Sequence, residues 1–175
     1  MILAASFILM TVLVAIDQVL KYIVVENLDI GEIISLINIG GRRVLELTHI
    51  RNSGAAWSIM QGKTWFLIGL PIVVLVVGIV FMVVKRKTLT KLEMIMISMI
   101  VAGGIGNLID RIRFKEVVDF ISFKLIDFPV FNFADICVVL GELLLIVYVF
   151  FGEFIAKKNK DKEKEQPKDN SDEQV

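Results

Sequence analysis

The sequence predicts a mainly α-helical membrane protein with four transmembrane helices and a small β element on the outer surface. Hydrophobic residues make up 56% of the 175 residues, and the mean hydropathy is +0.75. An average soluble domain is only about 45–50% apolar. Residues 65–84 contain no charge, and roughly 20 apolar helical residues cross a bilayer core. An ordinary soluble globule, and disorder over most of the chain, are therefore excluded.

Four segments are long and apolar enough to cross the bilayer, namely 1–25, 65–84, 92–109 and 133–152. The first one resembles a signal peptide in its position. It lacks a positively charged N-terminal region and a small-residue cleavage site before Asp17. We therefore expect it to be a retained span.

The basic residues predict the orientation. Residues 85–91 (KRKTLTK) hold four cations, and residues 157–175 hold six lysines and six acids. Dense Lys and Arg beside spans mark the cytoplasmic side. We expect both termini to be cytoplasmic, with a four-span domain over 1–156 and a charged, disordered tail over 157–175.

The segments on the other side contain strand-like patterns. Residues 44–50 (VLELTHI) and 116–126 (EVVDFISFKLI) are rich in β-branched residues, and Gly40-Gly41 marks a turn before the first of them. They predict a small β element lying on the outer membrane surface. His49 is expected to be a surface residue of its strand.

Five polar side chains fall at the outer level of the bilayer. Asp17 follows 16 residues of helix, which places it roughly 24 Å from the inner end at about 1.5 Å per residue. The other four lie at outer span ends or between spans: Asn52, Asp110, Asp119 and Asp135. Ionisable residues are costly in a membrane and indicate function. Their convergence on one level predicts a site there.

Local spacing leaves structural and functional interpretations open. Asp17 and Lys21 are four residues apart, so they share a helix face and can pair, either as a helix anchor or in a site. The small residues of AGGIGN permit close helix approach. Asn107, Asp110 and Arg111 then share one face, which suits an interfacial anchor or peptide recognition.

Two carboxyl groups have opposite expected tendencies. Asn132 and Asp135 fit a helix start, where the N-terminal dipole favours a charged Asp135. Asp119 lies in VVDFI between apolar residues, and desolvation favours its neutral form. This is the difference that an acid–base pair needs. Spacing alone does not show whether Asp119 and Asp135 meet.

Composition excludes other kinds of site. The single Cys137 cannot supply an intrachain disulfide or a Cys-rich metal site. The single His49 disfavours a His-cluster metal site and a Ser-His-Asp triad. Cys137 is expected to pack as a small apolar residue. Lys and Arg total 19, as do Asp and Glu, so no basic excess indicates nucleic acid. We expect no metal and no cofactor.

Two other classes of membrane protein remain as alternatives. A transporter or channel with an acidic path would have a midplane site within inverted repeats, and no repeat is visible. A non-catalytic assembly or chaperone protein could use the aspartates as interfacial anchors. A presenilin-like protease is disfavoured because neither Asp119 nor Asp135 lies in a GxGD context. Glu142 has no role in any of these interpretations.

Five short motifs carry a resemblance to a known family. They are DQVLK at 17–21, RNSGAAWS at 51–58, GGIGNLIDR at 103–111, VVDFI at 117–121 and FNFAD at 131–135. Each is weak alone, but in this order on a four-span chain they resemble the lipoprotein signal peptidases (signal peptidase II), bacterial aspartic intramembrane peptidases. The resemblance covers about residues 15–140.

The resemblance implies four transmembrane helices with a small extracytoplasmic β-cradle in the bacterial cell membrane. It implies cleavage of diacylglyceryl-modified prolipoproteins just before the lipidated cysteine, by a catalytic pair matching Asp119 and Asp135. The positions that match supporting residues of the family are Asp17, Lys21, Asn52, Gly54, Asn107, Asp110, Arg111, Asn132 and Ala134. We also expect contacts with membrane lipids and a monomeric enzyme.

Overall fold

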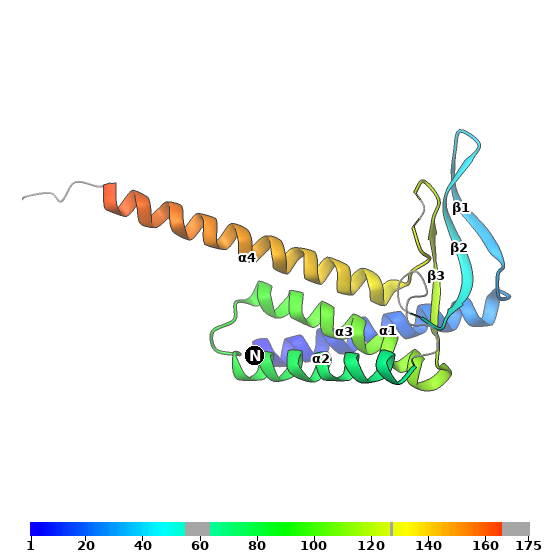
Figure 1. The fold of residues 1–175 in the computed structure, drawn as a ribbon, viewed down its shortest axis with the longest axis horizontal. Coiled ribbons are helices and arrows are strands. Elements are labelled where there is room, and N and C mark those ends of the chain that lie inside the picture. The colour runs from blue at the N-terminus through cyan, green and yellow to red at the C-terminus, as the bar shows by residue number, and fades with distance from the viewer. Residues whose placement is uncertain (55–63, 127, 166–175) are drawn as a thin grey trace, which may run out of the picture.

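The computed structural model describes residues 1–54, 64–126 and 128–165, and it contains long helices and one small sheet (Figure 1). The helices are α1 (Ile2–Asn27), α2 (Thr64–Val84), α3 (Lys91–Phe114) and α4 (Phe133–Glu165). The strands are β1 (Ile33–Ile39), β2 (Arg42–Asn52) and β3 (Val117–Phe123).

Four of the described helices are long and apolar enough to cross a membrane, which confirms the predicted spans. They alternate in direction (Figure 1), so the N-terminus, the α2–α3 link and the far end of α4 lie at one end of the helices. The sheet lies at the other end. The chain is therefore a multi-pass membrane protein with its β element on one side.

The helix α4 continues to Glu165, although the sequence predicts disorder from residue 157. Extension of an existing helix avoids the cost of nucleation. Residues 166–175 lie outside the described residues, so the expected tail stays a prediction there.

The helix α3 lies between the others and packs against α1, α2 and α4. It begins at a capping box, in which the Thr90 side chain accepts from the Glu93 amide and Glu93 accepts from the Thr90 amide. It ends where Lys115 adopts a left-handed conformation with φ 64°. The helix thus extends five residues past the predicted end at 109, and Asp110 belongs to it.

The sheet is antiparallel in the order β1-β2-β3. Gly40 and Gly41 form the β1–β2 turn with φ values of +58° and +78°, as the sequence predicts. The strand expected at 44–50 is confirmed as part of β2, and β3 lies within the segment expected at 116–126. Strand β1 was not predicted, because its sequence IISLINI shows neither a polar face nor a helical period.

The expectation for His49 is wrong in one respect. It lies in β2, but only 3% of the residue is exposed. Its Nδ1 lies 2.9 Å from the Leu28 carbonyl oxygen, and the Gly31 amide donates to the His49 carbonyl at 2.8 Å. The chain leaving α1 therefore covers this ring, which alternation along a single strand does not reveal.

Candidate active site

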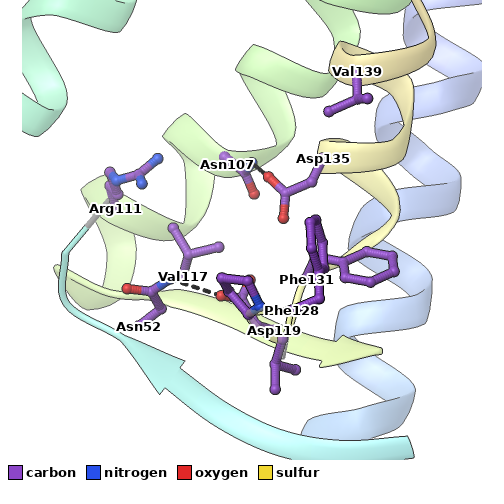
Figure 2. Close-up of a pocket in the computed structure, with 11 residues that line it drawn as sticks. Asn52, Asn107, Arg111, Val117, Asp119, Phe128, Phe131, Asp135 and Val139 are labelled. Carbon is purple, nitrogen blue, oxygen red and sulfur yellow. Dashed lines mark hydrogen bonds between the residues drawn. The ribbon is translucent and has the colours of Figure 1, made fainter. Parts of the chain in front are cut away.

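A cavity of about 230 Å³ lies where the helices meet the sheet, and both Asp119 and Asp135 line it (Figure 2). Asp119 comes from β3, and Asp135 comes from the first turn of α4. The structure thus brings together the two carboxyl groups that spacing alone could not connect. The cavity is also lined by Asn52, Asn107, Arg111, Val117, Phe128, Pro129, Val130, Phe131 and Val139.

Asp119 is buried, with 3% of the residue exposed. Its two carboxylate oxygens accept from the side-chain amides of Asn52 (2.8 Å) and Asn132 (2.7 Å). Burial raises the pKa of Asp119 to about 6, the charge of Asp135 also raises it, and the two amide hydrogen bonds oppose the shift. The raised pKa favours the neutral form of Asp119, as the sequence predicts.

Asp135 is held at the start of α4 by a reciprocal pair of hydrogen bonds. Its amide donates to Asn132 Oδ1, and its Oδ2 accepts from the Asn132 amide, both at 3.0 Å. This confirms the predicted N-terminal cap. Its other oxygen, Oδ1, accepts from Asn107 at 2.8 Å. Each carboxylate oxygen of Asp135 therefore has a hydrogen-bond donor.

Asn132 connects the two carboxyl groups directly. It is fully buried, its Nδ2 donates to Asp119, and its Oδ1 and backbone amide bond Asp135. The same Nδ2 also lies 3.0 Å from Asn107 Oδ1. One asparagine thus fixes the relative position of the two acids, and neither can turn without breaking a bond to it.

A buried ion network lies behind the cavity. Lys21 Nζ is 2.9 Å from Asp17, 2.9 Å from Asp110 and 3.0 Å from Asn107 Oδ1. The predicted Asp17–Lys21 pair is therefore confirmed, and Asp110 joins it from α3. All three charged side chains are almost fully buried, and buried charges are tolerated only when they are paired in this way.

The two acids of this network hold the backbone beside the two cavity acids. Asp17 accepts from the amide of Ala134, the residue before Asp135, at 3.0 Å. Asp110 accepts from the amide of Val118, the residue before Asp119, at 3.1 Å. The network therefore connects α1 and α3 with both elements that carry the cavity acids.

Gln18 is a residue of the buried network that sequence reasoning missed. Its Nε2 donates to Asp17 at 3.2 Å, to the Gly106 carbonyl at 3.2 Å and to Asp110 at 3.1 Å. It thereby orients both network carboxylates. The available signal was its position directly beside Asp17 in a span, where another polar residue is costly.

Arg111 and Gly54 lie on the side of the cavity near β2. The half-buried Arg111 donates weakly to the Gly54 carbonyl at 3.4 Å. The Gly54 amide donates to Asn52 Oδ1 at 3.0 Å, which orients the Asn52 amide toward Asp119. A guanidinium carries five N–H donors, so Arg111 retains donors that can face a ligand in the cavity.

Several other candidates lie elsewhere. Cys137 is buried with 3% exposed and does not line the cavity. Glu142 is exposed on α4. No group of three or more His, Cys, Asp or Glu residues that could hold a metal occurs within the described ranges. The chemistry that the cavity itself offers is that of two carboxyl groups in different surroundings, one buried on a strand and one at a helix N-terminus.

Comparisons with known proteins show what the chain is similar to. The family model described as signal peptidase (SPase) II matches residues 9–151. A lipoprotein signal peptidase of Enterococcus faecalis is 37% identical over 158 residues, which cover 90% of this chain and 95% of that protein. One from Listeria monocytogenes is 42% identical over 140 residues, covering 78% of this chain and 87% of that protein.

The fold is also similar to that of a bacterial membrane enzyme solved by the in meso method at 2.3 Å resolution. The TM-score is 0.75 at 32% identity, and the match covers 94% of this chain and 93% of that one. A second such enzyme structure, at 1.9 Å resolution, gives a TM-score of 0.73 at 35% identity, covering 83% of this chain and 92% of that one. The fold is therefore one that bacterial membrane enzymes adopt.

Proposed function

This chain belongs to the signal peptidase II family of membrane proteases, and on that basis we propose that it removes the signal peptide from diacylglyceryl-modified prolipoproteins. The scissile bond is the one just before the lipidated cysteine. The observation that carries the proposal is the pair Asp119 and Asp135, which line one cavity and share the contacts of Asn132. A supporting observation is the position of that cavity at the end of the spanning helices.

The two acids hydrolyse the peptide bond in two steps. Asp135 starts ionised and takes a proton from water, whose oxygen attacks the carbonyl carbon. Asp119 starts protonated and gives its proton to the carbonyl oxygen, forming a tetrahedral diol. Asp119 then takes a proton back from one hydroxyl as the C–N bond breaks, and Asp135 protonates the leaving amine. The pair returns to its starting state.

Two like charges in one site resist joint ionisation, so a single proton is shared between the acids. The pKa of about 6 for Asp119, raised by burial, favours that carboxyl as the proton carrier. Arg111 supplies donors to the substrate backbone or to the developing oxyanion. Asn52 and Asn107 act mainly by fixing the carboxylates to which they donate.

The site acts at the outer leaflet of the cell membrane. The basic link at 85–91 lies at the end of the helices opposite the sheet, and such links face the cytoplasm. An apolar cavity of about 290 Å³ adjoins the site and shares Asp135, Phe128, Phe131 and Val139 with it. This apolar continuation suits a substrate whose acyl chains stay in the lipid. We assign the peptidase to residues 1–156 and the cytoplasmic tail to 157–175.

The test is cleavage of a purified diacylglyceryl prolipoprotein in lipid vesicles. The wild type should release the signal peptide and leave the lipidated cysteine as the new N-terminus, which mass spectrometry identifies. Asp119→Asn and Asp135→Asn should each lower kcat about 10²–10⁴-fold, the range for lost acid–base catalysis.

Glu142→Gln is the matched control, because it removes an acid from the exposed surface of α4 and should leave kcat unchanged. Full cleavage by either aspartate variant would refute the catalytic pair. No cleavage by the wild type would refute the substrate assignment.

A further inference from the structure

Strand β1 exposes an unusual amount of apolar surface. All seven of its residues are exposed, and five of them are Ile or Leu: Ile33 (49%), Ile34 (42%), Leu36 (50%), Ile37 (44%) and Ile39 (65%). It is also an edge strand, with β2 as its partner on one side. In water such a strand is prone to aggregation, so this surface needs an apolar environment.

The placement of the β1–β2 hairpin shows what that environment is. In Figure 1 the strands run across the direction of the helices, and the hairpin reaches beyond them. Because those helices cross the bilayer, the strands lie along its surface and the hairpin extends over the surrounding lipid. The lipid of the same membrane is therefore the nearest apolar phase.

The charges near the tip of the β1–β2 hairpin also fit a lipid surface. Arg42 and Arg43 are exposed directly after the Gly40-Gly41 turn. The acid beside them, Glu46, is buried, and its carboxylate is 2.8 Å from Arg43 and 3.5 Å from Lys124. The exposed charge of the tip is therefore positive. Basic side chains at a membrane surface attract anionic headgroups.

We propose that the β1–β2 hairpin is a membrane anchor that inserts the Ile and Leu side chains of β1 into the outer leaflet, with Arg42 at the level of anionic phospholipid phosphates. The sheet transmits this anchoring to the site. β2 pairs with β3, and Ile50 is the pairing partner of Asp119. Anchoring of β1 thus sets the depth of Asp119 relative to the bilayer. The proposal stands on the hairpin itself and does not depend on the substrate assigned above.

The test is nitroxide depth measurement on the full chain in vesicles of phosphatidylglycerol and phosphatidylcholine. Cys137→Ser removes the single native thiol, and Leu36→Cys, Ile37→Cys and Ile39→Cys place one label each on β1. Lys87→Cys, in the exposed link at the opposite end of the helices, is the water-exposed control. Collision rates with oxygen and with a water-soluble nickel chelate report the depth.

The labels on β1 should show an oxygen-to-nickel ratio several-fold above that at position 87. Equal ratios would overturn the proposal. Dipolar broadening between labels of different copies would also overturn it, because β1 would then pair with a second chain. Arg42→Gln should reduce the depth in phosphatidylglycerol to its value in phosphatidylcholine alone. An unchanged difference between the two lipids would refute the headgroup contact.

Discussion

Asp119 and Asp135 have the same side chain in different surroundings, and the proposed acid–base pair rests on this difference. Asp119 is buried on a strand, so its neutral form is favoured. Asp135 lies at a helix N-terminus and accepts from a backbone amide. Asn132 contacts both, and it keeps the two groups within one cavity.

The pH dependence of catalysis follows from Asp119. The proposed mechanism needs Asp119 protonated, and its pKa is raised by burial to about 6. We expect kcat/KM to fall as the pH rises through about 6. Asn52→Ala removes a hydrogen bond that lowers this pKa, so the falling limb should move to higher pH.

The measurement is a profile of kcat/KM against pH for both proteins. Asn27→Ala is the control, because that exposed side chain donates to the Ile23 carbonyl, outside the cavity. A limb that stays in place or moves to lower pH in Asn52→Ala would contradict the role assigned to Asp119.

The same pKa predicts a pH dependence of stability. The folded pKa of Asp119, about 6 because of burial, lies above the usual value of about 3.9 in the unfolded chain. Its stabilising contribution is complete below about pH 4 and is lost as the pH rises through 6, by roughly 3 kcal/mol. The Tm of the wild type should therefore decrease relative to that of Asp119→Asn over this interval.

Thermal unfolding in detergent between about pH 4 and pH 8 checks this expectation. The quantity compared is how the Tm difference between the wild type and Asp119→Asn changes with pH. The substitution also alters the hydrogen bonds to Asn52 and Asn132, but it does so at every pH. A difference in Tm that is constant across the interval would mean that Asp119 does not titrate there.

At the scale of elements, a helix or strand could be predicted from the sequence where its own pattern of apolar and polar residues reflects its surroundings. The four spans were predictable because bilayer thickness dictates the length of an apolar helix. The Asn132–Asp135 cap was predictable because it is local. Strand β1 was missed because both of its faces are apolar, so no alternation marks it as a strand. Gln18 and His49 were missed because their surroundings come from segments distant in sequence.

Close packing of α3 is the element-level feature that brings the site together. A Cβ at Gly106 would press on the Asp17 carboxylate, and a Cβ at Gly103 would collide with the Ala134 carbonyl and Val138. Both contacts lie at the start of α4, because the Asp17 carboxylate accepts from the Ala134 amide. Gly103→Ala and Gly106→Ala should each destabilise the fold by about 1–3 kcal/mol, as overpacking does, and lower activity.

Thermal unfolding and the cleavage assay measure these two effects. Gly69→Ala, in α2, is the matched control because its Cβ would meet nothing within 4 Å, and it should behave as the wild type. If Gly106→Ala kept full stability and activity, the close approach of α3 and α1 would not be needed to hold Asp17.

At the scale of the whole molecule, the buried network behind the site exists only because four elements meet. It connects Lys21 on α1 and Asp110 on α3 with the strand that carries Asp119 and with the helix whose first turn carries Asp135. No two neighbouring segments of the sequence contain it. The convergence of acids at one bilayer level was predictable from helix lengths, but the connections through Asn132 were not, because they depend on how the elements turn toward one another.

The orientation of the whole molecule in the membrane is the remaining expectation. An even number of spans places the N-terminus, the α2–α3 link and the far end of α4 on one side, and the cations at 85–91 predict that this side is cytoplasmic.

In a Cys137→Ser background, Asp29→Cys lies between α1 and β1, and Lys87→Cys lies in the link. A membrane-impermeant maleimide added to right-side-out vesicles should label position 29 and leave position 87 unlabelled. Permeabilisation should then expose position 87, which controls for its reactivity. Labelling of position 87 alone in sealed vesicles would show the opposite topology. The two acids would then face the cytoplasm, where an exported prolipoprotein could not present its cleavage site to them.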